Sequence, residues 1–249
     1  MPRRPLAFLL IAATLIPTSS QAIPPQDDAS KLYAVYARKM KAAVQALKDC
    51  TFTLHRNEWI GDRMNGPQTQ LVWYRAPMSF YMKWVTPTPG REVILDKGRY
   101  DDELVVNPGP YLPTLHLDPV GRLAMDGQRN PIFDLSMHSI VGIIIRDSEV
   151  VDAHPAWVPD VDDLGPRAVY GEAGRCFNAR IPKDQDPSFY AHRVEICFSE
   201  RTLLPLVIKS WDIAAGSMRL VEDYGYEKMQ VNVGLTDAHF DVDNPEYGF

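Results

Sequence analysis

A stripe of thioether and aromatic side chains carries the clearest chemical character in the sequence. Its members occupy every second position of one strand-like stretch and therefore project to one face; they are Met78, Phe80, Met82 and Trp84. Unbranched thioethers adapt to irregular apolar partners and aromatic rings supply contact area, so this face suits an apolar ligand such as a lipid chain. Trp73, on the preceding strand, is expected to extend it. The same pattern is typical of an ordinary sheet core, and both interpretations stay open.

No catalytic, metal-binding or cofactor-binding motif occurs in the sequence. The six histidines are scattered without an H-E-x-x-H pattern, and no serine lies in G-x-S-x-G. Two acidic clusters, at 160–163 and 241–244, lack the spaced oxygen ligands, glycine and glutamate of a calcium loop. Glycine-rich loops that bind phosphate are missing as well. We therefore expect no catalytic residue, no metal and no cofactor, and a protein that is not an enzyme.

Three cysteines define the redox chemistry that is open to the chain. Cys176 and Cys197 lie in strand-like segments, 175–182 and 190–199, that a turn-rich stretch separates, which predicts a hairpin. If the two cysteines face each other, the antiparallel register also gathers apolar residues on one face, so we expect a disulfide between them. Cys50 is then left as a thiol. Two buried thiols that never bond are the alternative.

The first 22 residues have the three parts of a secretory signal peptide. A basic start precedes an apolar stretch at 6–16 and a small-residue cleavage site, so we expect cleavage between Ala22 and Ile23. The apolar stretch is too short to span roughly 30 Å of hydrocarbon, and no later run approaches roughly 20 apolar residues, so no transmembrane anchor is expected. The sequence predicts a freely diffusing periplasmic protein.

Size and charge narrow the classes of partner. Removal of the signal leaves residues 23–249, enough for one domain with a sizeable core. The formal net charge of the full chain is −6 and no basic run occurs, so nucleic acid is excluded as a partner because phosphate binding needs clustered Lys and Arg.

The elements that must position these residues follow from the apolar periodicity. A period near four predicts a helix at 27–48, and an apolar stretch at 131–147 favours a second helix, although three consecutive isoleucines and Gly142 leave a strand open. A period of two predicts strands besides the cysteine hairpin; they are 51–59, 68–75, 79–86, 92–96, 103–107, 167–172, 204–211 and 217–228. We expect irregular structure at 107–130 and a surface connection at 151–166, both rich in proline.

These elements predict an α+β fold, a curved antiparallel sheet that forms an open half-barrel with helices packed on its concave face. At the end of the chain, three aromatic residues lie on an acidic segment: Phe240, Tyr247 and Phe249. They either pin the terminus to the core or dock a partner protein.

Several strings of the sequence resemble a family of exported bacterial proteins that is known only as a domain of unknown function. The strings are 73–84, 90–94, 118–125 and the closing motif 235–249. The family is in turn similar in outline to the LolA/LppX-like lipoprotein carriers, whose half-barrel holds acyl chains between a curved sheet and covering helices. This second likeness is one of architecture, and architecture alone does not assign a function.

Three functional hypotheses remain. The first is a non-enzymatic carrier for a lipid or a lipoprotein acyl chain, with the stripe as its ligand wall and the helix after Pro131 as part of a lid. The second is a cell-envelope protein that binds a protein partner and has a filled core. The third is a hydrolase whose residues converge only in space. An apolar cavity in the structure favours the first over the second.

Overall fold

The structure, a computed structural model, describes residues 26–154, 157 and 160–249. The predicted signal peptide at 1–22 and its cleavage site between Ala22 and Ile23 lie outside the described residues, so both stay predictions. Within the described part, no helix combines the length and the apolar character that a membrane crossing requires.

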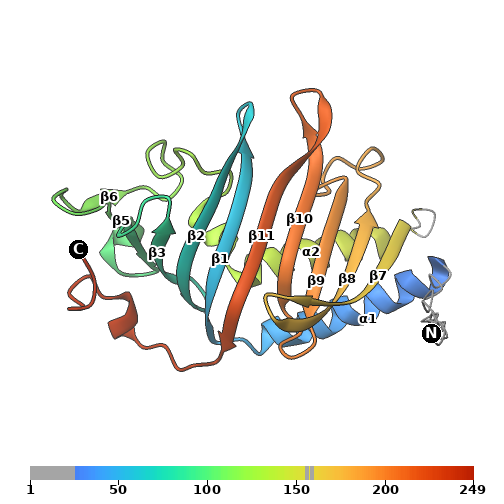
Figure 1. The fold of residues 1–249 in the computed structure, drawn as a ribbon, viewed down its shortest axis with the longest axis horizontal. Helices are drawn as coiled ribbons and strands as arrows, with labels where there is room; N and C mark the ends of the chain where they lie inside the picture. The colour runs from blue at the N-terminus through green and yellow to red at the C-terminus, as the bar shows by residue number, and fades with distance from the viewer. Residues whose placement is uncertain (1–25, 155–156, 158–159) are drawn as a thin grey trace, which may run out of the picture.

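The described residues form one curved, open antiparallel sheet of eleven strands, in the order β6-β5-β4-β3-β2-β1-β11-β10-β9-β8-β7 (Figure 1). The strands are β1 (Asp49–Ile60), β2 (Arg63–Arg75), β3 (Ser79–Thr86), β4 (Glu92–Asp96), β5 (Leu104–Asn107), β6 (Leu115–Leu117), β7 (Asp160–Val169), β8 (Glu172–Arg180), β9 (Arg193–Ser199), β10 (Pro205–Ala214) and β11 (Ser217–Val231). Consecutive strands within each half are neighbours, as short connections require. The first strand pairs with the last, for example Leu54 with Tyr226, which joins the two halves.

Two helices accompany the sheet: α1 (Gln26–Gln45) and α2 (Met137–Asp152). The predicted second helix is confirmed, but it begins later than Pro131, after a short 3₁₀ turn at Ile132–Leu135. Ser136 explains the start, because its backbone is extended and its hydroxyl accepts a hydrogen bond from the Ser139 amide at 2.9 Å. The three consecutive isoleucines are therefore helical.

Both helices pack on the same face of the sheet, behind the strands in the view of Figure 1. The main core joins Met40 of α1 and Val141 of α2, neither of which is exposed, to Phe80 and Phe198 of the sheet. Alternate positions of the strands enter this core, which is the period of two that the sequence displays. Helix α1 lies along the half of the sheet that ends at β7, and it contacts both β7 and α2.

Two predicted connections contain strands. The segment 107–130 includes β6, and 151–166, expected to be a surface connection, contributes most of β7. The expected strand at 167–172 was placed too late, since β7 ends at Val169. Two physical reasons explain the error. β7 is an edge strand, where Pro166 can lack an amide donor, and its acidic residues are satisfied by arginines, for example Asp163 by Arg175 of β8.

The C-terminal tail covers the other face of the sheet, over β3, β4 and β5. The Tyr247 ring stacks on the Tyr81 ring with centroids 4.1 Å apart, and Phe240 is fully buried between the tail and the sheet. The Gly248 amide donates to Glu92 Oε2 at 2.6 Å. The aromatic residues of the tail therefore pin the terminus to the sheet, the first of the two roles expected for them.

Candidate binding pockets

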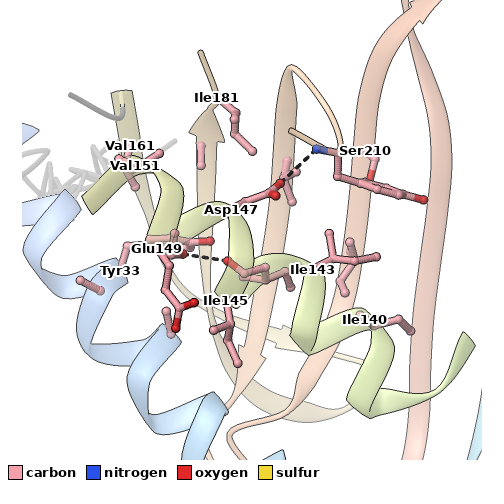
Figure 2. Close-up of a pocket in the computed structure, with 18 of the residues that line it drawn as sticks. Tyr33, Ile140, Ile143, Ile145, Asp147, Glu149, Val151, Val161, Ile181 and Ser210 are labelled. Carbon is pink, nitrogen blue, oxygen red and sulfur yellow. Dashed lines mark hydrogen bonds between the residues drawn. The ribbon is translucent and has the colours of Figure 1, made fainter. Parts of the chain in front are cut away.

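The larger pocket is a cavity of about 560 Å³ between the two helices and the half of the sheet formed by β7 to β11 (Figure 2). Its walls are mostly apolar and come from α1, α2 and five strands; among the lining residues are Ala34, Ala37, Ile140, Ile144, Val161, Ala179, Val194 and Ile208. The helical residues follow the helical period: three positions separate Ala34 from Ala37, and four separate Ile140 from Ile144, so each pair lies on one helix face. Alanines on α1 leave room that larger side chains would fill.

The floor of the larger pocket follows one row of residues in register across the sheet. From the edge strand inward, the row is Val161, Ala179, Val194, Ser210, Glu222 and Glu58. Directly opposed residues of antiparallel strands project to the same face, so the row changes from apolar to polar as it moves to the centre of the sheet. The floor that the sheet provides thus has an apolar outer part and a polar inner end.

The polar inner end is built around the buried carboxylate of Glu222. Tyr190 donates a hydrogen bond to this carboxylate, Asn130 Nδ2 donates to its Oε1 at 2.9 Å, and Arg129 Nε donates at 3.1 Å. Burial, and then the charge of Glu222, raise the pKa of Tyr190, so its phenol keeps its proton and remains a donor. The charge of Glu222 is matched by Arg129.

A second carboxylate extends this network toward β1. Glu58 accepts a hydrogen bond from Tyr224, and its Oε1 lies 3.7 Å from Nη1 of Arg56. Both side chains of the Arg56–Glu58 pair are almost completely buried. We call Arg56, Glu58, Asn130, Tyr190, Glu222 and Tyr224 the polar cluster. A buried polar network is stable only if its groups are satisfied, so the cluster needs all of its members.

The smaller pocket, about 230 Å³, lies on the far side of the polar cluster, against β3, β4, β5 and the segment 108–135. Asn130 lines both pockets, while Arg56 lines the smaller one and Glu222 lines the larger one. Met82 and Trp84 of the predicted stripe belong to its wall. The interior of the fold therefore contains two apolar spaces on either side of a polar partition.

The structure brings most of the predicted ligand wall together. Phe80, Met82 and Trp84 are buried on the face that the helices cover, and Met78 packs against them. Trp73 does not extend this surface: it pairs with Tyr81 and stacks on it at 4.5 Å on the opposite face. The reason is register, since opposed residues share a face and Tyr81 alternates with the stripe. Contact of any of these residues with a ligand stays a prediction.

Sequence reasoning did not find the walls of the larger pocket. Its α1 residues were assigned only to a helix, and Val161 was placed in a connection. One signal was available: the alanines at positions 34 and 37 fall on one helix face and are small. Ile140 and Ile144 line the pocket from α2, and the lid role expected of this helix stays a prediction.

The predicted disulfide is confirmed. Cys176 and Cys197 are direct partners in the register of β8 and β9, and a bond joins them with a Cα–Cα distance of 4.0 Å. Cys50 is a buried free cysteine, and burial raises the pKa of its thiol from 9.0 to about 12. The Cys50 thiol therefore stays protonated, which makes it a poor nucleophile.

The titratable groups of the described residues offer no metal site, because no three His, Cys, Asp or Glu side chains among them are grouped to hold an ion. His138 is partly buried and bonds through Nδ1 to the Tyr74 hydroxyl at 2.8 Å. Desolvation lowers the pKa of His138, so its imidazole is neutral near pH 7.

Comparison with protein families places most of the chain in one family. A family model described as "Protein of unknown function (DUF1571)" matches residues 47–249. This match confirms the resemblance to a family of unknown function that the strings of the sequence indicate. No curated protein matches the chain.

Three solved structures illustrate the likeness of fold. The lipoprotein LppX of Mycobacterium tuberculosis is 11% identical, with a TM-score of 0.48 over 85% of this chain and 99% of LppX. A LolA superfamily protein from Nitrosomonas europaea is 13% identical, with a TM-score of 0.35 over 84% and 97%. The MucA/MucB complex of Pseudomonas aeruginosa gives 14% identity and a TM-score of 0.39, and the match spans 86% of this chain and 60% of that one. All three TM-scores lie below 0.5, so the function is argued from the pockets.

Proposed function

The chain belongs to the DUF1571 family of proteins of unknown function, and we propose that it is a non-enzymatic periplasmic binding or carrier protein for a hydrophobic ligand. The ligand class is a lipid or a lipoprotein acyl chain. The supporting observation is the larger pocket, about 560 Å³ with mostly apolar walls. Pockets of this size and lining are typical of small-molecule binding sites. In this proposal the helices cover the concave face of the sheet, and α2 forms part of the lid.

The free energy available in the larger pocket suits reversible carriage. Each methylene removed from water contributes about 0.8 kcal/mol, so ten sheltered methylenes give about 8 kcal/mol before costs. Loss of ligand freedom and ordering of side chains reduce this figure, which leaves micromolar or weaker affinity. Such a ligand binds without a covalent bond and can be released, as a carrier requires.

The same pocket argues against the hypothesis of a filled core. Side chains that line an empty apolar space lose dispersion contacts, and the lost stability grows with the cavity volume. Space between α1, α2 and the sheet is therefore a cost to folding that a ligand would offset. A protein that works only through its surface has no need of it.

The proposal that the larger pocket binds lipid is tested by a substitution that fills this pocket. Ala34 lies on α1 and lines the larger pocket, so Ala34→Phe should occupy the space of the ligand. We expect the wild-type protein, isolated from its own periplasm, to carry lipid detectable by native mass spectrometry after gentle extraction. The variant should lose most of that lipid while its unfolding midpoint is kept or raised.

A matched control carries the same Ala→Phe substitution at a position that does not line the pocket. Ala168 of β7 is exposed and does not line the pocket, so Ala168→Phe should keep its lipid. If the wild-type protein carries no lipid, or if Ala34→Phe keeps as much as the control does, the proposal is wrong.

A second candidate role, contact with an envelope protein partner, is favoured by a separate observation. The segment between β5 and α2 exposes several large apolar side chains: Tyr111, Leu112, Val120 and Leu123. Exposed apolar groups gathered on one segment often mark interaction sites. Cross-linking from position 111 in the periplasm tests this role, and an unchanged monomer band after cross-linking would rule it out.

A further inference from the structure

We propose that the smaller pocket is a separate binding site for a carboxylate on a short apolar chain, a ligand of the fatty-acid class, and that Arg91 binds the carboxylate. The proposal does not depend on the function assigned to the larger pocket. It rests on an arginine whose Nε has no hydrogen-bond partner and which lines a mostly apolar pocket.

Arg91 is unusual among the arginines of the fold. Its Nε is buried without a hydrogen-bond partner, and no carboxylate of the described residues lies within ion-pair distance of its guanidinium. Most other buried or half-buried arginines are matched, as Arg129 is by Glu222 and Arg175 by Asp163. Arg91 is half-buried, but its Nε is shut off from water and makes no hydrogen bond, so an anion that accepts from this Nε regains an interaction that the folded chain leaves unmade.

The pocket positions Arg91 for this task. Arg91 immediately precedes β4, and its guanidinium carbon is 5.8 Å from the centroid of the Trp84 ring, whose face holds the cation in place. Arg56 lines the inner end of the pocket, and its Nε is also buried without a partner. Asp126 is the one acidic side chain in the lining; it is exposed and pairs with neither arginine among the described residues.

The remaining walls select an apolar chain. They comprise side chains of β3 to β6 and of the segment that follows; among them are Met82, Val93, Leu104, Val106, Leu117 and Leu135. Leu115 and Leu123 are partly exposed at the same pocket and provide an apolar rim for entry. The volume is less than half that of the larger pocket, which favours a short chain. A planar guanidinium matches the two oxygens of a carboxylate, so a fatty acid satisfies both the walls and the charge.

Calorimetric titration of the full mature protein with octanoate and with octan-1-ol tests the site. Octanoate should bind, and Arg91→Gln should weaken its binding about tenfold or more, because a charge-assisted hydrogen bond is lost. The alcohol should bind the wild type more weakly than octanoate does, and Arg91→Gln should leave its affinity unchanged. Arg91→Lys, which keeps the charge but not the planar fork, should fall between the two proteins.

Two further variants locate the effect. Ala124 lines the smaller pocket, so Ala124→Phe should weaken both octanoate and octan-1-ol. Ala34→Phe fills the larger pocket and should leave octanoate binding unchanged, which separates this site from the proposed carrier function. Arg122→Gln changes an exposed arginine outside the pocket and serves as the charge control.

Three results would each overturn the proposal: no binding of octanoate to the wild type, equal binding of octanoate to wild type and Arg91→Gln, or a loss in Ala34→Phe as large as that in Ala124→Phe. Thermal melts show whether each variant folds. If Arg91→Gln does not fold, the octanoate affinity of Arg91→Lys tests the proposal instead.

Discussion

Lys41 of α1 and Glu149 of α2 form an ion pair, with Nζ and Oε1 2.9 Å apart, and both side chains line the larger pocket. The pair connects the two helices that cover this half of the sheet. Because both side chains are substantially exposed, its contribution to the free energy of unfolding is small, about 1 kcal/mol or less. Its position leads us to predict that it acts as a latch for the pocket.

Reversal of one charge should open the latch. Glu149→Lys places a cation beside Lys41, and we expect a bound fluorescent fatty acid to leave about two- to fivefold faster, since about 1 kcal/mol of attraction is lost. Stopped-flow release kinetics measure the rate. The double variant Lys41→Glu, Glu149→Lys restores the pair and should restore the rate; release that stays at the wild-type rate in the single variant would show that the pair is no latch.

The C-terminal tail should contribute to stability without affecting the pockets. Tyr247→Ala removes the stacking on Tyr81 and a contact with Trp73 at 5.8 Å, so the free energy of unfolding should fall by about 1–3 kcal/mol in urea titrations. Lipid content should not change, because the tail lies on the opposite face. Tyr111→Ala is the control: Tyr111 is fully exposed, and its loss should change stability by less than about 0.5 kcal/mol.

Removal of one partner of the buried Arg56–Glu58 pair should lower the free energy of unfolding considerably. Glu58→Ala leaves Arg56 buried without its carboxylate and removes the acceptor of Tyr224, so we expect a loss of about 3–5 kcal/mol. The double variant Arg56→Met, Glu58→Ala should lose less than the single variants Arg56→Met and Glu58→Ala together, because no unpaired charge remains. Urea unfolding of the four proteins gives the coupling energy, and additive losses would contradict the pairing.

Alkaline pH should destabilise the fold. Burial raises the pKa of Tyr33 and of Tyr74 from 10.0 to about 12, and that of Cys50 from 9.0 to about 12. These groups hold their protons longer in the folded chain than in the unfolded chain, so their stabilising contribution is complete below about pH 9 and is lost as the pH rises toward 12. Urea midpoints at intervals from pH 8 to pH 11 should therefore decline above about pH 9. A constant midpoint across this interval would show that these groups titrate normally.

Local patterns fixed much of the sheet in advance. The bounds of β3 and β4 agree with the stretches 79–86 and 92–96. Both strands are largely buried on both faces, since the main core covers one face and the C-terminal tail covers the other. The pairing of Cys176 with Cys197 followed from the alternation of apolar residues, since the register that opposes the cysteines also aligns the apolar residues of their hairpin. Where an edge strand carries prolines and paired acids, as in β7, the local pattern resembled a loop.

The sequence alone determined which residues alternate, where the chain turns and which cysteines meet, because these properties depend on neighbours along the chain. Only the tertiary structure decided that Trp73 lies opposite the stripe, that Ala34 and Val161 face one cavity, and that Arg91 has no counter-charge among the described residues. Those facts depend on how far the helices stand from the sheet and on which strands lie side by side. Contacts between residues that are distant in the chain set the helix–sheet distance and the order of the strands. A local pattern of apolar residues contains no information about such contacts.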